Sequence, residues 1–258
     1  RRLGDPKNAI TYFRRAIEIG PLQATIEFSL GLSLLTLGQF REGWEKYEYR
    51  WSIPRAKNWK TPINDRELWK GEEDQSVVVW REQGIGDDII FLGLIPEARE
   101  RSKSLAVYID HRLIPLCERS MSDIKFLPNV ESLRNEESDY HLPMGSLPRL
   151  MRNEVEDFDR TIKGYLQANT DRVEALRKEL DVEGKTVIGI SWKSFKSLNQ
   201  SKKSMELKDF EKIFKGLDVV LLNLQYGEVD EEIRKFTKET GIEVLQCSSV
   251  DNREDLDG

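Results

Sequence analysis

The stretch from residue 77 to residue 93 constrains the fold most strongly. A β-branched apolar run at residues 77–80 is followed by Gly84 and Gly86, and then by apolar residues at helical spacing. A strand, a glycine-containing turn and a helix in this order are typical of the first unit of a Rossmann-like parallel sheet. Because glycine tolerates positive φ and close approach of a ligand, we expect Gly84 and Gly86 to make a sharp turn at the ligand-binding edge.

Two carboxylates, Asp87 and Asp88, stand where the helix begins. They would repel a pyrophosphate, and Ile89 replaces the third glycine of the dinucleotide fingerprint, so a nicotinamide or flavin dinucleotide is disfavoured. Asp110, after the next predicted strand, nevertheless lies at roughly the distance of the usual ribose-binding acid. A carboxylate on this turn can act as the general base for a sugar hydroxyl. The alternative is that Asp87 or Asp88 only caps the helix.

The first 55 residues contain an internal repeat with a shift of 34 residues, which aligns Leu3-Gly4 with Leu37-Gly38 and Phe13 with Tyr47. This period resembles the tetratricopeptide repeat. We expect helices at 6–19, 23–36 and 40–51. One and a half repeats cannot bury their own faces, so they dock on the next domain or belong to a longer array. A partner-binding superhelix and a structural prop both remain open.

Several aromatic side chains lie within the third predicted helix. Trp44, Tyr47 and Trp51 lie at helical spacing and share one face. We expect them to pack against the following domain. The chain begins with Arg1 in the middle of a repeat pattern and without an initiator methionine, so we expect a fragment or a trimmed chain.

The fold class that we predict is α + α/β. Strands alternate with helices after the repeats, which predicts parallel sheets. We divide the chain into helical repeats at 1–55, a connector at 56–75, a Rossmann-like domain at 76–170, and a linker helix with the first part of a second Rossmann-like domain at 171–258. Three predicted strands make this second sheet incomplete, because a sheet normally has about five or six.

Composition excludes several classes of protein. The 258 residues carry 40 basic and 46 acidic side chains, a net charge of −6, which gives no reason to expect a nucleic-acid partner. No apolar run reaches the roughly 18–20 residues of a membrane span. Cys117 and Cys247 are isolated, and His111 and His141 are the only histidines. We therefore expect a cytoplasmic protein without a zinc site or another bound metal.

Polar and basic residues follow the first strand of the second predicted sheet. Lys193 and Ser194 come directly after the strand, and Lys203 stands in the serine-rich loop behind them. Ammonium and hydroxyl groups on such a loop suit a diphosphate. The alternative is a solvated basic loop. In the first domain, His141 is expected on a loop after a short strand, where it either contacts substrate or is structural.

These pieces, taken in order, resemble a bacterial family in which tetratricopeptide repeats precede a heptosyltransferase-like glycosyltransferase of the two-domain GT-B fold. The resemblance covers nearly the whole chain. The motifs that carry it are Gly43-Trp44-Glu45-Lys46-Tyr47-Glu48 with Arg50-Trp51, Leu68-Trp69-Lys70-Gly71-Glu72, Glu82-Gln83-Gly84-Ile85-Gly86-Asp87, Asp139-Tyr140-His141 with Ser146-Leu147-Pro148, Gly189-Ile190-Ser191-Trp192-Lys193-Ser194, Lys203-Ser204-Met205-Glu206-Leu207 and Asn223-Leu224-Gln225-Tyr226-Gly227.

The resemblance implies roles for particular residues. Asp87 matches the acid with which heptosyltransferases activate the acceptor, and Lys203 matches a lysine near the donor phosphates. We expect the donor nucleotide diphosphate to be bound by Lys193, Ser194, Lys203 and Gln225, and the acceptor side to include Gly84, Gly86 and His141. The family continues beyond the stretch like 250–258 with a His-x-Ala-Gly type motif that holds the donor diphosphate. That motif is absent here, so we expect this polypeptide by itself to be inactive.

The leading functional hypothesis is the amino-terminal portion of an inverting, metal-independent glycosyltransferase. It would use a nucleotide-sugar as donor substrate, no cofactor, and a glycan, lipid or protein as acceptor. The first alternative is a non-catalytic tetratricopeptide scaffold that retains a protein partner on the repeat surface. The second is a dinucleotide-dependent oxidoreductase, which the missing third glycine disfavours.

Overall fold

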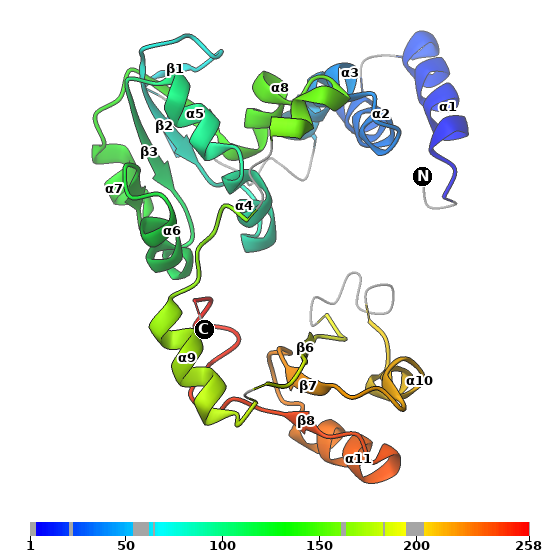
Figure 1. Cartoon of the computed structure of the whole chain (residues 1–258). Helices are drawn as coiled ribbons and strands as arrows, with labels where there is room; N and C mark the ends of the chain where they lie inside the picture. Colours follow the sequence, from blue (N-terminus) through cyan, green and yellow to red (C-terminus); the bar gives the residue numbers. More distant parts are fainter. Residues whose placement is uncertain are drawn as a thin grey trace. The chain divides into compact units, whose positions relative to one another are not determined.

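The chain divides into two compact units, residues 1–167 and residues 168–258. The computed structural model describes residues 4–20, 23–53, 62–63, 65–160, 164–182, 184–194 and 204–257. The first unit contains the amino-terminal helices and a five-stranded parallel sheet, and the second contains a three-stranded parallel sheet (Figure 1). The expected combination of a helical segment with two parallel α/β sheets is thereby confirmed.

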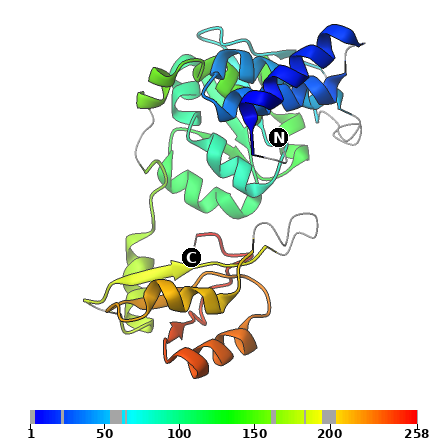
Figure 2. The ribbon, with the colours of Figure 1, turned by 90° about the vertical axis from the view of Figure 1, so that its right-hand side faces the viewer.

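The helical segment consists of α1 (Pro6–Ile19), α2 (Ala24–Thr36) and α3 (Phe40–Tyr47), followed by the 3₁₀ turn η1 (Glu48–Ser52). Helix α1 begins as its sequence predicts, because the Asp5 side chain accepts a hydrogen bond from the backbone N–H of Asn8 at 3.1 Å. Pro6 occupies the first helical position. The helices, blue in Figure 2, pack side by side. The third predicted helix is shorter than expected, since η1 replaces its last turn.

The sheet of the first unit is entirely parallel, with strand order β1-β5-β2-β3-β4. Its strands are β1 (Glu67–Leu68), β2 (Ser76–Trp80), β3 (Ser104–Tyr108), β4 (Lys125–Leu127) and β5 (Tyr140–Pro143). The connecting helices are α4 (Ile85–Leu92), α5 (Ile95–Arg101), α6 (Ile114–Ser120), α7 (Val130–Asn135) and α8 (Leu147–Met151), with 3₁₀ turns η3 (His111–Leu113), η4 (Met144–Ser146) and η5 (Val155–Arg160).

The strand order creates a topological switch point. The chain runs outward from β2 through β3 to β4, and then returns to the other side of β2 as β5. In open parallel sheets of this kind, ligands bind at the carboxyl ends of the two strands that flank such a point. The loops after β2 and β5 are therefore the place to look for a site.

Two details differ from the sequence prediction. The sequence predicts one helix through Phe91, Leu94, Ile95 and Ala98. This helix is broken at Gly93 and Leu94 into α4 and α5, because Pro96 has no N–H to donate to a preceding carbonyl. The stretch expected to be a connector contributes the edge strand β1, and Trp69 beside it is fully buried.

The second unit contains α9 (Thr170–Glu179), β6 (Val187–Ile190), η7 (Leu207–Phe210), α10 (Glu211–Phe214), β7 (Val220–Asn223), α11 (Asp230–Thr240) and β8 (Val244–Leu245). Its strands pair in parallel in the order β6-β7-β8. Helix α11 ends at Gly241, whose φ of 73° is the left-handed conformation that glycine adopts readily.

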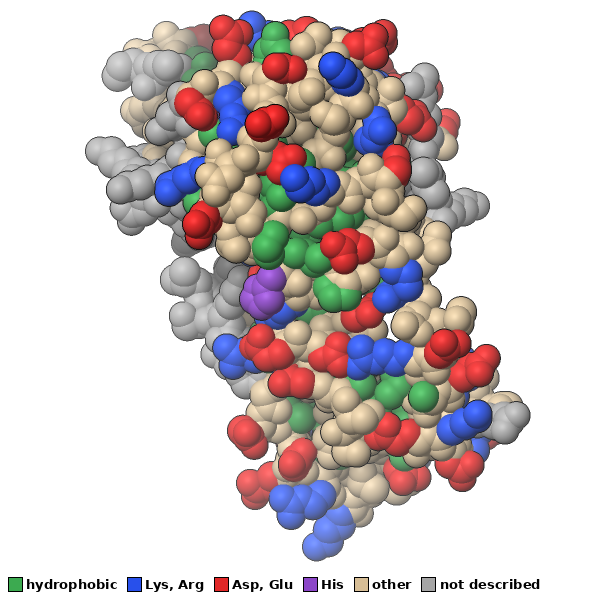
Figure 3. Space-filling view, turned by 90° about the vertical axis from the view of Figure 1, so that its left-hand side faces the viewer, with side chains coloured by type: hydrophobic (Ala, Val, Ile, Leu, Met, Phe, Trp, Pro, Cys, Tyr) green, Lys and Arg blue, Asp and Glu red, His purple; other side chains and the backbone are tan. Residues whose placement is uncertain are grey.

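The surface carries charges of both signs. Lysine and arginine side chains alternate with aspartate and glutamate over the face that Figure 3 shows. Such a mixture creates no large field of one sign. Within the described part of the chain, no helix combines the length and the apolar character that crossing a membrane requires.

Candidate functional site

The switch point between β2 and β5 is filled by Arg50, a residue of the helical segment. Its side chain is only 1% exposed. Nε and Nη2 donate to the two carboxylate oxygens of Glu82, directly after β2, at 3.1 and 2.8 Å. Nη1 donates to Glu48 at 2.7 Å, and Nη2 also donates to the Ser146 hydroxyl, after β5, at 2.8 Å. One guanidinium thus joins η1 to the ends of two strands.

The groups around this guanidinium are also bonded to one another. Ser146 Oγ donates to Glu48 at 2.9 Å, and the Gly145 amide donates to Glu82 Oε1 at 3.0 Å. The rings of Tyr47 and Trp51 lie 4.7 and 4.9 Å from the guanidinium carbon. These contacts satisfy the hydrogen-bonding groups that burial removes from water.

Burial works against both charges of the Arg50–Glu82 pair. Burial raises the pKa of Glu82, although the attraction of Arg50 acts in the opposite direction. For Arg50, burial by itself lowers the pKa, but Glu82 and Glu48 outweigh it and the pKa of the guanidinium is raised. Arg50 therefore stays charged and compensates two carboxylates.

The loop from Gln83 to Asp87 leads from this cluster into α4. Gln83 Nε2 donates to the Tyr47 hydroxyl at 2.7 Å, which attaches the loop to α3. The Asp87 side chain accepts the backbone N–H of Gly84 at 3.1 Å, so Asp87 does cap the helix. A carboxylate has two oxygens and about four acceptor positions, so this bond leaves capacity for another donor.

The two glycines of the loop do not have the geometry that we expected. Gly84 has φ −84° and ψ 166°, an extended conformation that any residue adopts, and no sharp glycine turn forms. The chain bends at Gln83, and the extended Gly84 is the N-cap residue from which α4 begins. Gly86 lies inside the first turn of α4, where a Cβ would meet no atom within 4 Å. Space beside Asp87 is therefore open at this position.

A second ionic cluster lies beside the loop. Arg81 contacts Asp88 through Nε at 2.8 Å and Asp110 through Nη1 at 2.9 Å, and Arg112 Nε donates to Asp110 at 2.8 Å. Burial raises the pKa of Asp88 to about 6, against the attraction of Arg81. The hydrogen bond from Arg112 leads the causes that lower the pKa of Asp110. Asp110 is the residue at the sequence spacing of a ribose-binding acid, and it has arginine partners on both of its oxygens.

His141 lies within β5 and not on the loop after it. It is 5% exposed, its Nδ1 accepts from Trp80 Nε1 at 3.0 Å, and the two rings stack at 6.1 Å. Burial leads the causes that lower its pKa, which favours the neutral imidazole that this bond requires. These contacts are those of a core residue.

In the second unit, Gln225 holds the turn that follows β6. Its Oε1 accepts from Ser191 Oγ at 3.1 Å and from the amides of Trp192 and Lys193 at 3.1 and 2.9 Å. Its Nε2 donates to the Tyr226 carbonyl at 3.1 Å, and the residue is 2% exposed. Gln225 thus joins the carboxyl ends of β6 and β7, where a ligand of this sheet would lie.

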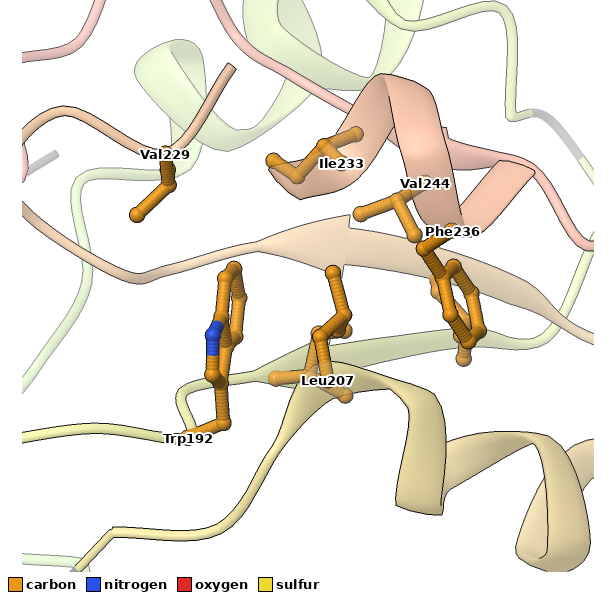
Figure 4. Packing of buried hydrophobic residues seen from close by; sticks show 8 residues of the cluster. Trp192, Leu207, Val229, Ile233, Phe236 and Val244 are labelled. Carbon is orange, nitrogen blue, oxygen red and sulfur yellow. The ribbon is translucent and has the colours of Figure 1, made fainter. Parts of the chain in front are cut away.

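The side chains around this turn are anchored by α11 and by the unit's core. Trp192 Nε1 donates to Glu232 at 2.9 Å, and Lys193 forms an ion pair with the same carboxylate. The Trp192 ring packs with Leu207, Val229, Ile233, Phe236 and Val244 (Figure 4). The Ser194 amide donates to Ser204 Oγ at 3.0 Å. Lys203, the other expected donor-binding residue, lies outside the described residues.

The expected site residues therefore fall into two groups. Gly84, Gly86, Asp87 and His141 belong to the first unit, and Lys193, Ser194 and Gln225 belong to the second. Sequence reasoning missed Glu82, Gly145 and the central role of Arg50, although all three stand in or beside motifs that it singled out. Among the described residues, no group of three or more histidine, cysteine, aspartate and glutamate side chains is arranged to hold a metal ion.

Comparisons with known proteins give one distant relative. No family model and no solved structure matches the chain. Protein FlbA of Caulobacter vibrioides is 28% identical over 91% of the chain. The chain spans 42% of the length of that relative. Its name states no activity, so the likeness shows a distant relationship and leaves function to be argued from the site.

Proposed function

We propose that this chain forms part of an inverting, metal-independent glycosyltransferase of the GT-B type, whose helical segment is a tetratricopeptide-like array. The observation that carries the proposal is the pair of parallel sheets in separate units, each with polar groups at the carboxyl ends of its strands. In the proposal the first unit receives the acceptor beside Asp87, and the second unit receives the nucleotide-sugar beside Lys193 and Ser194. The acceptor is a glycan, a lipid or a protein.

The chemistry requires one base and one stabilised leaving group. The Asp87 carboxylate takes the proton of the acceptor hydroxyl while the hydroxyl oxygen attacks the anomeric carbon of the donor sugar. The bond between that carbon and the diphosphate oxygen breaks, and the nucleoside diphosphate leaves with the electron pair. Lysine ammonium groups compensate its negative charge. The open space at Gly86 supports this assignment, because an acceptor can approach the helix end there.

Calorimetric titration of the full-length protein of which this chain forms part, with UDP, GDP, ADP, CDP and dTDP, tests the donor side. We expect one of these diphosphates to bind, and Lys203→Ala to weaken its binding by about tenfold, since one charge-assisted contact is worth roughly 1.5–3 kcal/mol. Lys212→Ala is the matched control, because the Lys212 side chain is 83% exposed and pairs only at the surface with Asp209. Absence of binding by every diphosphate would reject the donor assignment.

The acceptor side is tested in the same full-length protein by two substitutions in the first turn of α4. Asp87→Asn should leave diphosphate affinity unchanged and lower the rate of sugar transfer about 100- to 10,000-fold, because the amide cannot accept the proton. The Gly86→Ala variant should fold normally and should lower the affinity for the acceptor without changing that for the diphosphate, since the new methyl group occupies the open space. Unchanged transfer by the Asp87→Asn variant would reduce Asp87 to a helix cap.

A second candidate function is a non-catalytic scaffold. The observation that favours it is the filled switch point, where Arg50 and its partners occupy the place of a ligand. A scaffold would retain a peptide on α1, α2 and α3 and would bind no nucleoside diphosphate. The titration above separates the two functions, because a peptide-binding array with no affinity for any diphosphate fits only the scaffold.

A further inference from the structure

Two ion pairs among the described residues join the helical segment to the rest of the first unit, and one is buried while the other is exposed. Arg41 pairs with Glu154 at 2.7 Å, with side chains 66% and 58% exposed. Arg50 pairs with Glu82 at 2.8 Å, with side chains 1% and 2% exposed. An exposed pair contributes little to stability, whereas a buried pair fixes the positions of both partners. Of these two ion pairs, only the buried one reaches the segment that leads into α4, where Asp87 lies.

The contacts of Arg50 define where Glu82 lies. The planar guanidinium donates to both carboxylate oxygens, so the carboxylate cannot rotate or shift without loss of a bond. The Gly145 amide also donates to the same carboxylate. A Cβ at Gly145 would overlap Glu82 Oε1, so the space around that oxygen is fully used. Glu82 is therefore held between η1 and the end of β5.

The same restraint extends to the helix cap. Gln83 follows Glu82 directly and donates to the Tyr47 hydroxyl, and the Tyr47 ring lies against the Arg50 guanidinium. Only Gly84, Ile85 and Gly86 separate Gln83 from Asp87, and Asp87 itself is bonded to Gly84. The start of the loop is thus fixed by residues of the helical segment at two successive positions.

We propose that Arg50 is a positioning residue, which holds the loop at 82–87 through Glu82, so that the helical segment is a built-in part of the acceptor side. The assignment of an acceptor to this side rests on the proposed function. The positioning of the segment 82–87 by Arg50 does not depend on that function. Because Arg50 closes the gap between β2 and β5, an acceptor reaches Asp87 from the side of Gly86 and not through the switch point.

Amide hydrogen exchange of the whole chain tests the positioning. Arg50→Lys keeps the charge and removes the planar fork, and we expect exchange at 83–88 and 144–146 to rise about 10- to 100-fold, while the amides of β3 keep their rates. Arg41→Lys is the matched control, since it makes the same change at the exposed contact and should alter neither region. Unchanged loop exchange in Arg50→Lys would overturn the proposal. A uniform rise that includes β3 would also overturn it, because Arg50 would then act on global stability only.

A milder variant protects the test against loss of folding. Ser146→Ala leaves both charges in place and removes one hydroxyl that bridges Arg50 and Glu48. We expect a smaller rise, about three- to tenfold, in the same two regions. The absence of any local rise in this variant, if Arg50→Lys does not fold, would overturn the proposal.

Kinetics separate this inference from the proposed function. In a glycosyltransferase, Arg50→Lys should lower kcat about tenfold or more and leave both the donor KM and the diphosphate affinity unchanged, because the donor is assigned to the other unit. An equal effect on donor affinity would contradict the positioning role. Failure of every diphosphate to bind, together with a local rise in exchange, would reject the glycosyltransferase and keep Arg50 as the residue that positions the loop.

Discussion

Asp88 is a buried acid whose environment favours its protonated form. It is 1% exposed, and burial raises its pKa from the ordinary value of 3.8 to about 6, although Arg81 lies 2.8 Å away. The folded chain therefore binds this proton more tightly than the unfolded chain. The contribution of Asp88 to the unfolding free energy is greatest below about pH 4 and falls as pH rises through about 6.

Asp88→Asn should remove this pH dependence. Two pKa units correspond to about 3 kcal/mol, so the unfolding free energy of the parent chain should fall relative to that of the variant by about this amount between pH 4 and pH 7. Urea unfolding of both proteins at pH 4, 5, 6 and 7 measures the difference, and other titrating groups cancel in it. A difference that stays constant over this range would show that the Asp88 pKa is not raised.

The glycines illustrate what a sequence reveals at the scale of single residues. Gly84 and Gly86 attract attention because they flank a helix start, yet neither requires the absence of a side chain in the folded chain. Gly145 does require it, because a Cβ there would overlap Glu82. That requirement arises from a residue 63 positions away in the chain, and local patterns contain no information about such a contact.

At the scale of elements, α2 and α3 approach closely through two glycines. A Cβ at Gly31 would lie 2.9 Å from backbone atoms of Lys46, and a Cβ at Gly43 would lie 2.7 Å from the Leu35 side chain. Lys46 also forms an ion pair with the buried Glu27 at 2.8 Å. Close backbone contact therefore sets the spacing of these two helices.

Exchange of one glycine on each of two helices should have opposite effects. Gly31→Ala should lower the unfolding free energy by about 1–3 kcal/mol, because the Lys46 backbone must move. Gly86→Ala should raise it by about 0.5–1 kcal/mol, since alanine favours the helix and its methyl group meets no atom. Chemical denaturation at pH 7 measures both. Destabilisation by Gly86→Ala would show that the space beside Asp87 is not open.

Element positions followed well from the sequence, and their surroundings did not. Periodicity placed α1 and α2 to within one residue, and the apolar run at residues 77–80 placed β2 equally closely. The break between α4 and α5 and the short strand β1 were missed, because a two-residue edge strand has no period of its own. The last turn of the helix predicted at 40–51 is instead the 3₁₀ turn η1.

At the scale of the whole molecule, the two units should unfold as two transitions in calorimetry. Gln225→Leu should lower the midpoint of only one, because it leaves the Trp192 and Lys193 amides without their acceptor, at a cost of about 2–4 kcal/mol. Gly31→Ala should lower only the other midpoint. A single transition that both variants shift equally would show that the chain unfolds as one cooperative body.

The candidate site could be predicted from the sequence only in part. The sequence placed Asp87 at a helix start, because this position follows directly from the strand and turn pattern. It could not reveal that Gln225 accepts three hydrogen bonds from the neighbouring turn. It also could not reveal that Arg50 meets Ser146, 96 positions away, because such contacts arise from tertiary packing.

The Arg50 contact has a consequence for how such a chain can be divided or recombined. A chain of this architecture would most simply be divided in the segment between its amino-terminal helices and its five-stranded sheet. Here a cut between residues 53 and 76 would separate the buried Arg50 guanidinium from the Glu82 carboxylate and leave that carboxylate without its charged partner. A transferable portion that contains the five-stranded sheet therefore has to begin before α3. A chimaera with a different helical segment has to keep residues 40–53 of this chain.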